Sequence, residues 1–326
     1  MRTGVSGGYK SPFMSLRIAL VGQAAFGEKT LERLVAAHHV AAVYCPPDGA
    51  GGKVDPLKRL ALDLGIPVHQ PKSMKGDDVL REFTELGADL AVLAFVTVIV
   101  PERLLSVPKL GTICFHPSLL PRYRGGSAIN WQLIRGERRG GLTIFWTDAG
   151  IDTGPILLQK EVAIGPDDTV GSLYYEQIFP LGLDAMEEAV RLIAEGRAPR
   201  VPQDESQASY DPLCREQHVG IDWSRPGREV YDLVRGSDPQ PGAWGRHHGE
   251  RLRVYDCRYL PDGGGEAGQI LLIGPEGAEI SLVDGVLLVG RMRLGDATQK
   301  TTPEALARDD RIRVGDRLEA GEAHAR

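Results

Sequence analysis

Short apolar runs separated by amphipathic stretches dominate the first half of the chain. Five of these runs have the length and composition of buried strands: Leu16–Val21, Val40–Cys45, Ala88–Phe95, Gly111–His116 and Leu142–Trp146. Between the first two runs we expect a turn over Gly22–Gly27 and a helix over Glu28–Ala37, where apolar residues recur at helical spacing. Strands that alternate with helices predict an α/β fold with a doubly wound, mostly parallel sheet.

The pattern changes after a polar stretch that ends near Tyr210. A helix is predicted over Pro226–Arg235. Four short apolar runs with glycine turns between them follow: Arg251–Tyr255, Gly268–Ile273, Ala278–Leu282 and Val286–Met292. Such closely spaced strands predict a small β-barrel. We therefore expect a disordered start at residues 1–13, a sheet domain over 14–205 and a barrel domain over 206–326. After Arg311–Val314 the pattern predicts a frayed end.

Composition fits a globular enzyme of two domains. The chain has 326 residues, 42% of them hydrophobic, and no run approaches the ~18 apolar residues of a membrane span. The first 13 residues lack the apolar segment of a signal peptide. No CxxC or metal-ligand spacing relates the four cysteines, which are Cys45, Cys114, Cys214 and Cys257. We expect reduced thiols in a cytoplasmic protein and no bound metal.

The glycines at positions 22 and 27 are a weak nucleotide-binding signal. They do not form GxGxxG, and Cys45 rather than an acidic residue stands at the end of the second predicted strand. A structural turn is the better interpretation. We therefore expect no nicotinamide cofactor.

Two polar residues follow neighbouring apolar runs. His116 ends the run Gly111–His116, and Asp152 comes shortly after the run that ends at Trp146. Open α/β sheets place their chemistry where strands end, so we expect these side chains to meet at adjacent strand ends. Histidine titrates near neutral pH, and a carboxylate can orient it or accept a proton itself. A lone histidine is often only a buried structural residue. Whether His116 is structural or catalytic therefore has to be judged from the loop between the two residues.

That loop resembles one family. The stretch His116-Pro-Ser-Leu-Leu-Pro-Arg-Tyr-Arg-Gly125, followed by Asp148-x-x-x-Asp152-Thr-Gly154, is similar to the 10-formyltetrahydrofolate-dependent formyltransferases. The strongest likeness is to the hydrolase domain of 10-formyltetrahydrofolate dehydrogenase. Methionyl-tRNA and sugar formyltransferases are more distant. The resemblance extends from Met14 through nearly the whole chain, and it implies a formyltransferase sheet domain with an OB-like barrel after it.

The resemblance also implies functional residues. His116 and Asp152 are the implied catalytic pair, and Cys114 stands where the amine-directed transferases carry an asparagine. The dehydrogenase's hydrolase domain lacks that asparagine too. A cysteine offers only a weak donor at this position, so Cys114 is either an apolar filler or a nucleophile that holds the formyl group. Residues implied to bind 10-formyltetrahydrofolate are Leu93, Phe95, Val96, Ser118, Leu119, Leu120, Arg122, Asp148, Ala149 and Gly150.

Several of these residues have a second interpretation. Phe95 suits a core position as well as it suits the cofactor. Asp148 is better explained as an acceptor within the turn that positions Asp152. Arg122 and Arg124 match the carboxylates of a folate tail, although Arg124 could equally brace the loop. Asn130 and the tryptophan after it are expected to be structural.

The acceptor of the formyl group is left open by the sequence. A small or carrier-bound amine is expected. Alternatives are water, a phosphopantetheine thiol on an acyl-carrier-type partner, and the amine of a charged initiator tRNA. From Tyr210 onward the chain has 16 Lys and Arg against 20 Asp and Glu, a net charge of −4. Because a nucleic-acid surface is usually basic, this balance weakens the tRNA alternative. A folate-binding module without turnover is the non-enzymatic alternative, and no membrane partner is expected.

Overall fold

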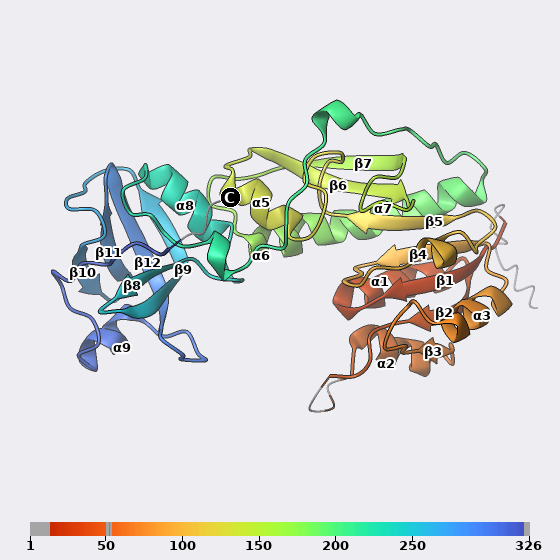
Figure 1. The fold of residues 1–326 in the computed structure, drawn as a ribbon, viewed down its shortest axis with the longest axis horizontal. Coiled ribbons are helices and arrows are strands. Elements are labelled where there is room, and N and C mark those ends of the chain that lie inside the picture. Colours follow the sequence, from red (N-terminus) through yellow and green to blue (C-terminus); the bar gives the residue numbers. More distant parts are fainter. Residues whose placement is uncertain (1–13, 50–51, 53, 323–326) are drawn as a thin grey trace, which may run out of the picture. The chain divides into compact units, whose positions relative to one another are not determined.

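The computed structural model describes residues 14–49, 52 and 54–322, so the expected disordered start at 1–13 lies outside the described residues. The chain divides into two compact units (Figure 1). The first contains residues up to Pro121 with Leu142–Lys160 and Phe179–Ala208, and the second contains Arg122–Gly141, Glu161–Ile178 and the chain from Ser209 onward. Two segments upstream of residue 205 thus group with the second unit, and the domain boundary at that residue stays a prediction.

A seven-stranded sheet forms the centre of the first unit. Its strands are β1 (Arg17–Gly22), β2 (His39–Tyr44), β3 (Val68–His69), β4 (Leu90–Ala94), β5 (Thr112–His116), β6 (Arg139–Trp146) and β7 (Ile156–Ala163). The spatial order is β3-β2-β1-β4-β5-β6-β7. Neighbours from β3 to β5 are parallel, whereas β5 and β6 are antiparallel. The predicted doubly wound, mostly parallel sheet is confirmed.

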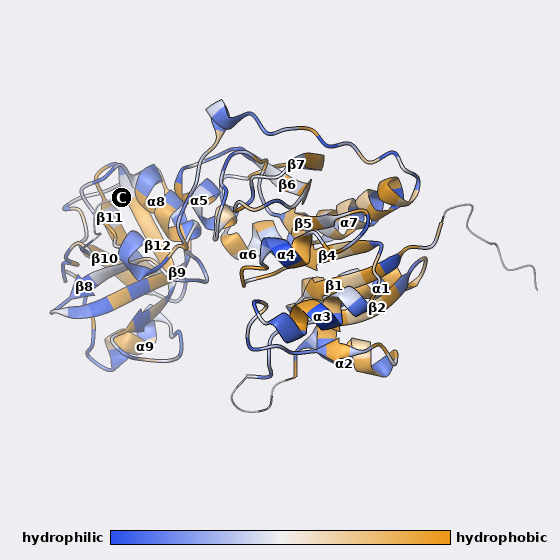
Figure 2. Cartoon of the chain, turned by 45° about the vertical axis from the view of Figure 1, so that its right-hand side comes forward, coloured by the Kyte–Doolittle hydropathy of each residue, from blue (hydrophilic) through white to orange (hydrophobic). Residues whose placement is uncertain are grey.

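Helices cover both faces of this sheet. They are α1 (Ala24–Val35), α2 (Pro56–Asp63), α3 (Asp77–Glu85), α4 (Glu102–Leu105) and α7 (Phe179–Ala194). Val79 and Phe83 of α3 pack with Leu93 of β4 in one apolar cluster. On the other side, Phe26 of α1 stacks against Phe115 of β5 with ring centroids 4.4 Å apart. Figure 2 shows the hydrophobic colour along β1 and β4, which is the apolar sheet interior that the sequence pattern predicted.

The expected turn over Gly22–Gly27 is wrong, because α1 already begins at Ala24. Gln23 stands at the cap position without a capping side chain. The carboxylate of Asp55 instead accepts from the backbone N–H of Ala24, at 3.1 and 2.9 Å. Asp55 is 31 positions away in the chain, and it accepts from a backbone N–H at the start of the helix that no neighbouring residue pairs. The helix therefore starts earlier than its apolar spacing suggests.

A five-stranded antiparallel sheet forms the second unit's core. Its strands are β8 (Trp244–His247), β9 (Glu250–Leu260), β10 (Ile270–Gly274), β11 (Gly277–Leu282) and β12 (Gly285–Leu294), in the order β10-β11-β12-β9-β8. Helices α5 (Ala128–Ile134), α6 (Val170–Ser172), α8 (Gly227–Arg235) and α9 (Pro303–Arg308) complete the unit. Val230 and Val234 of α8 join the buried cluster of this sheet. The arrangement agrees with the predicted barrel-like domain.

Residues 315–321, which follow Val314, are held by backbone hydrogen bonds, contrary to the expectation of a frayed end. The amide of Gly315 donates to Ile270 at the β10 edge over 2.8 Å. Glu319 and Arg246 exchange two backbone hydrogen bonds of 2.9 Å at the β8 edge. The segment therefore pairs with both edge strands of the sheet and removes their exposed edges. These hydrogen bonds join backbone atoms and do not require apolar side chains. The hydropathy pattern therefore gave no sign that this segment is ordered.

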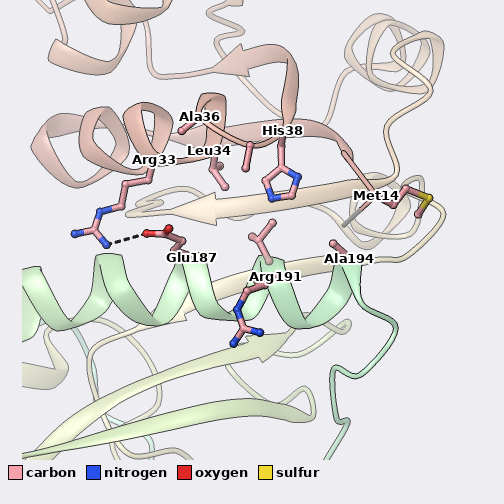
Figure 3. Close-up of a pocket in the computed structure, with 10 residues that line it drawn as sticks. Met14, Arg33, Leu34, Ala36, His38, Glu187, Arg191 and Ala194 are labelled. Carbon is pink, nitrogen blue, oxygen red and sulfur yellow. Dashed lines mark hydrogen bonds and ion pairs between the residues drawn. The ribbon is translucent and has the colours of Figure 1, made fainter. Parts of the chain in front are cut away.

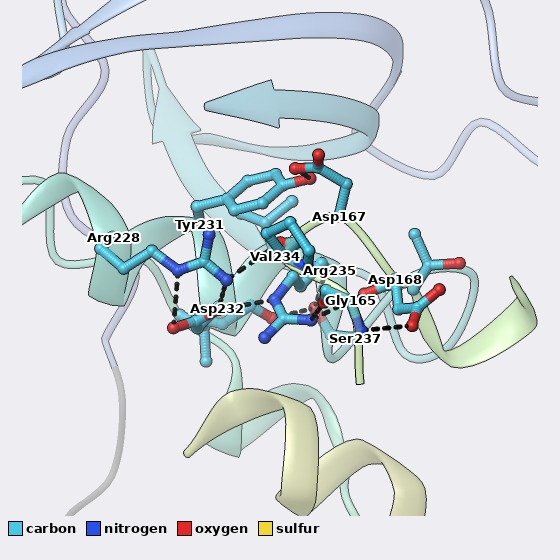
Figure 4. A network of polar contacts seen from close by, with 12 residues as sticks. Gly165, Asp167, Asp168, Arg228, Tyr231, Asp232, Val234, Arg235 and Ser237 are labelled. Atoms are coloured by element: carbon cyan, nitrogen blue, oxygen red, sulfur yellow. Dashed lines mark hydrogen bonds and ion pairs between the residues drawn. The ribbon is translucent and has the colours of Figure 1, made fainter. Parts of the chain in front are cut away.

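A buried ionic network fixes α8 within the second unit (Figure 4). The Asp232 carboxylate accepts from Arg228 at 2.7 Å and from Arg235 at 2.5 Å. Arg235 is fully buried and also donates to the Asp168 carbonyl over 2.9 Å. Because a buried guanidinium needs both a counter-charge and acceptors, this network has a structural role. Asn130 of α5 is likewise structural, since its side chain donates to the carbonyls of Gly236 and Gln240.

No helix among the described residues combines the length and apolar character needed to cross a membrane.

Candidate active site

His116 and Asp152 lie side by side in the first unit. The Nδ1 atom of His116 is 3.5 Å from the Oδ2 atom of Asp152. Side-chain exposure is 7% for the histidine and 17% for the aspartate, so the pair is screened from bulk water but open on one side. At this distance the contact is an ion-pair contact, longer than the usual range of a hydrogen bond. The carboxylate can thus orient the imidazole.

The sequence predicted that the two side chains meet at adjacent strand ends. The ends of β5 and β6 are not adjacent in the structure. Strand β6 runs antiparallel to β5, and its last residue, Trp146, is paired with Ile113 near the start of β5. The loop after β6 must therefore fold back toward the carboxyl end of β5 to bring Asp152 to His116. Cys114 lies two residues before His116 on β5 and so shares its face of the sheet.

The backbone around Asp152 is held in an unusual conformation. Asp152 has φ 58°, in the left-handed region that costs a non-glycine residue roughly 1–3 kcal/mol. The side-chain amide of Gln203 donates to the carbonyls of Asp152 and Gly154, at 2.8 and 2.7 Å. A Cβ atom on Gly154 would lie 1.7 Å from the Trp146 carbonyl oxygen, so only glycine fits there. These contacts fix the direction of the Asp152 side chain.

Asp148 has the turn role that the sequence analysis favoured. Its Oδ1 atom accepts from the Gly150 amide at 3.0 Å and from the Thr153 hydroxyl at 2.6 Å. The carboxylate therefore shapes the turn before Asp152. Ala149 and Gly150 are exposed residues of this turn.

A second set of bonds holds the loop that follows His116. The hydroxyl of Thr143, fully buried on β6, donates to the Ser118 carbonyl at 2.7 Å and accepts from the Leu120 amide at 3.1 Å. The Gln159 side chain donates to the same hydroxyl at 2.9 Å and to the Leu120 carbonyl at 2.8 Å. Ser118 and Leu120 are buried, so they act here through the backbone and support the loop.

Cys114 is held as a neutral thiol. Burial raises the pKa of the Cys114 thiol far above its usual value, and the nearby Asp152 carboxylate raises it further. The Sγ atom lies 3.5 Å from the Phe115 carbonyl oxygen. A thiol that resists ionisation is a poor nucleophile, so the environment favours the apolar-filler interpretation over a covalent role.

The strand end at β4 presents main chain and apolar surface. Phe95 leaves the strand with φ 59° and is 39% exposed, so the core interpretation of its side chain is wrong. Val98 and Ile99 are 54% and 69% exposed. Leu93, by contrast, is buried in the cluster beneath α3, so only its backbone is a candidate contact. Ile151, 47% exposed, adds apolar surface beside Asp152 in the chain.

Arg122 and Arg124 belong to the second unit. The Arg122 guanidinium pairs with the Glu137 carboxylate and lies over the Tyr123 ring. Arg124 is buried, and its backbone pairs with Ser209 and Asp211. Burial of Arg124 fits a bracing role for this residue. Because Arg122 already pairs with Glu137, the carboxylates of a folate tail would have to compete with Glu137 to bind Arg122.

Two of the cavities among the described residues are lined by the first unit alone. The larger, about 340 Å³, lies where β1 and β2 end, and its lining includes Gln23, Pro46, Lys72, Lys75 and Val96. It borders the point between β1 and β4 at which the strand order reverses, the usual ligand crevice of such sheets.

The smaller cavity, about 220 Å³, lies between α1 and α7 (Figure 3). It is bordered by the pair Arg33–Glu187, 3.2 Å apart, and by His38. None of the site residues expected from the sequence lines it.

Sequence reasoning missed Gln203, Thr143 and Gln159. All three act through hydrogen bonds to backbone atoms distant in the chain, and an isolated polar residue gives no local sign of such a bond. The strand around Gln159 gives no signal either, because its sequence, ILLQKEVA, does not alternate between polar and apolar residues.

Comparisons with known proteins agree on one family. A model described as formyl transferase matches residues 16–185, and a model of the formyl transferase C-terminal domain matches residues 215–309. Human cytosolic 10-formyltetrahydrofolate dehydrogenase is 43% identical over 74% of this chain and 27% of its own length. A methionyl-tRNA formyltransferase of Geobacter sulfurreducens is 37% identical over 94% of this chain and 98% of its own length. The chain thus spans under a third of the curated dehydrogenases that it matches.

Solved structures share the fold. HypX from Aquifex aeolicus in complex with tetrahydrofolic acid superposes with a TM-score of 0.69 at 18% identity, over 93% of this chain and 49% of that one. An N-formyltransferase from Helicobacter canadensis, solved with folinic acid and dTDP-3-aminofucose, gives a TM-score of 0.64 at 17% identity, over 84% of this chain and 98% of that one.

Proposed function

The chain belongs to the formyl transferase family, whose members move a one-carbon group, and from that premise we propose that it transfers the formyl group of 10-formyltetrahydrofolate to a small or carrier-bound amine. The observation that carries the proposal is the His116–Asp152 pair, 3.5 Å apart, which brings the end of β5 together with the hydrogen-bonded loop after β6. Tetrahydrofolate and a formamide are the products.

The pair would serve both ends of the reaction. As the amine attacks the formyl carbon, negative charge develops on the formyl oxygen and the amine becomes acidic. Because Nδ1 of His116 faces Asp152, we assign Nε2 as the nitrogen that donates to that oxygen. Asp152 stabilises the imidazolium and, directly or through water, accepts the proton that the amine loses. The folate nitrogen leaves as its bond to the formyl carbon breaks, and it takes up a proton.

The pterin would bind at two exposed backbone segments, residues 95–99 and 148–151. A flat ring with several donors and acceptors suits main chain that is not already paired within a strand. Apolar side chains at both segments, Phe95 and Ile151 among them, supply surface for its faces. Both segments lie in the first unit with the catalytic pair.

The cavity of about 340 Å³ shares residues 96–99 with the segment proposed for the pterin, so only its remaining lining is left for a compact acceptor. Proline and apolar residues form much of its wall, and Lys72 and Lys75 line the same cavity. An amine that also carries a carboxylate or phosphate would match this lining by charge. Gln23 and Thr97, joined by a 3.3 Å side-chain contact, bridge the ends of β1 and β4 beside it.

Hydrolysis of 10-formyltetrahydrofolate is the second candidate. Cys114 favours it, because the amine-directed transferases that the sequence resembles have an amide donor at this position. With only a thiol there, attack by water assisted by Asp152 is the simpler reaction.

Turnover with different acceptors tests the proposal. Release of tetrahydrofolate from 10-formyltetrahydrofolate would be followed with small anionic amines, a phosphopantetheine thiol, charged initiator tRNA, or water alone. We expect an added amine to raise the rate and to appear as a formamide by mass spectrometry. The His116→Ala variant is the inactive control, and His39→Ala, on the exposed start of β2, is the matched active one. An unchanged rate with every amine, together with formate release, would establish the hydrolase instead.

A further inference from the structure

Three potential metal ligands converge in the second unit, far along the chain from the catalytic pair. They are His247 at the end of β8, His248 in the following turn, and Asp316 in the segment that pairs with both sheet edges. One ligand atom from each lies within 4.8 Å of the other two. The side chains of His247 and Asp316 already touch, with Nε2 and Oδ2 2.8 Å apart.

The local backbone holds these three residues in place. Arg246 and Glu319 exchange two 2.9 Å hydrogen bonds, which fasten the β8 edge to the segment that carries Asp316. His248 has φ 48°, a left-handed conformation that turns the chain directly after His247. The imidazole rings of His247 and His248 lie with their centroids 4.2 Å apart. His247 is buried and His248 is exposed, so the cluster opens to solvent on one side.

We propose that His247, His248 and Asp316 bind a Zn²⁺ ion that straps the closing segment to β8. Two imidazoles and one carboxylate form a donor set that suits zinc, with water as the fourth ligand. Ligands of a tetrahedral zinc at ~2.1 Å stand roughly 3.4 Å from one another. A separation of 4.8 Å would therefore shorten by about 1.4 Å, which the exposed turn residue His248 can supply, and the 2.8 Å between His247 and Asp316 would lengthen by about 0.6 Å.

The neighbouring groups tolerate a cation. The Asp316 carboxylate accepts the Arg313 amide at 2.7 Å, and its remaining acceptor sites suffice for a metal bond. Nearby guanidinium groups are engaged elsewhere: Arg311 pairs with Glu250 at 2.8 Å, and Arg313 pairs with Asp310. The cysteine spacing gave no reason to expect a metal in this chain, and the proposed ligands include no cysteine.

The test is titration of the whole chain with Zn²⁺ after removal of bound metal by a chelator. Calorimetry should show one equivalent bound. The variants His248→Asn and Asp316→Asn should each weaken binding by about 10²-fold or more, since even loss of a residue behind a ligand costs 10–100-fold. Asparagine tolerates the left-handed conformation at position 248 and keeps the carboxylate's shape at 316, so both variants should fold. The matched control is His69→Ala, because His69 also faces a carboxylate, Glu82, at 3.2 Å.

Two further readouts separate this site from other metal binding. Backbone hydrogen exchange at Asp316 and Glu319 should slow when Zn²⁺ is added, because the strap spans those residues. With Co²⁺ as the probe, the absorption spectrum should lack a thiolate-to-metal charge-transfer band. Zn²⁺ binding that survives both asparagine variants, binding that His69→Ala weakens equally, a thiolate band, or no binding at all would each overturn the proposal.

Discussion

Gln203 should control activity through the loop that carries Asp152. Its amide donates to two carbonyls of that loop, at 2.8 and 2.7 Å, and Asp152 itself stands at φ 58°. Replacement by methionine keeps the length of the side chain and removes both donors. The Asp152 backbone would then lose the contacts that hold its left-handed conformation.

The magnitude follows from the two hydrogen bonds. Each contributes a net ~0.5–1.5 kcal/mol, so their loss costs the loop about 1–3 kcal/mol. The left-handed conformation itself costs a similar ~1–3 kcal/mol, which leaves the variant loop free to relax. Since 1.36 kcal/mol is a factor of ten in rate, we expect Gln203→Met to lower turnover by roughly 10- to 100-fold.

The assay is release of tetrahydrofolate, combined with a double-mutant cycle. If Gln203 acts by positioning Asp152, then Gln203→Met should cost almost nothing further in an Asp152→Ala background. Gln207→Met is the matched control, because Gln207 lies on the same polar stretch and its amide donates to Asp204. A full 10-fold loss in the Asp152→Ala background, or wild-type turnover in the single variant, would refute the reasoning.

Further outcomes test the rest of the site. His116→Ala and Asp152→Ala should each cut turnover by about 10²-fold or more with folate affinity nearly unchanged, as measured by single-turnover kinetics and equilibrium binding. Cys114→Ala should retain most activity, and intact mass should show no formyl adduct on the wild type. Cys114 should also resist alkylation at pH 8, because its raised pKa keeps the thiol protonated there; peptide mapping reads this out. Thr143→Val should lower the free energy of unfolding by about 1–3 kcal/mol, measured by denaturant titration, since it removes a buried hydroxyl that makes three hydrogen bonds.

The sheet domain was largely predictable because its strands are buried on both faces. Residues 90–95, for example, are apolar throughout, and that pattern belongs to a parallel sheet covered by helices. Element ends were less predictable wherever a distant residue decides them. The start of α1 depends on Asp55, and no window around Ala24 contains that information.

The candidate site was predictable in its residues but not in its geometry. The motif pointed to His116 and Asp152, yet their meeting depends on the loop after β6, which folds back because β6 runs antiparallel to β5. Alternating helices and strands favour parallel neighbours, so we expected β5 and β6 to end at the same edge of the sheet. Because they are antiparallel, they end at opposite edges. The hydrogen bonds of Gln203 and Thr143 could not be predicted from the sequence for a related reason. Their partners are backbone carbonyl and amide groups, which nearly every residue has.

Cys114 places a constraint on whichever reaction the protein performs. Loss of one oxyanion donor commonly costs ~2.7–4 kcal/mol of transition-state stabilisation, and a neutral thiol recovers little of it. The formyl oxygen would therefore depend on His116 for most of its stabilisation, which requires a protonated imidazole. Asp152, 3.5 Å away, is the group that can orient this imidazole. In a transferase with an amide beside the histidine, the same carboxylate would be less needed for that purpose and more available as a base. Cys114→Asn should therefore move the balance toward transfer to an amine, with Asp152 retained.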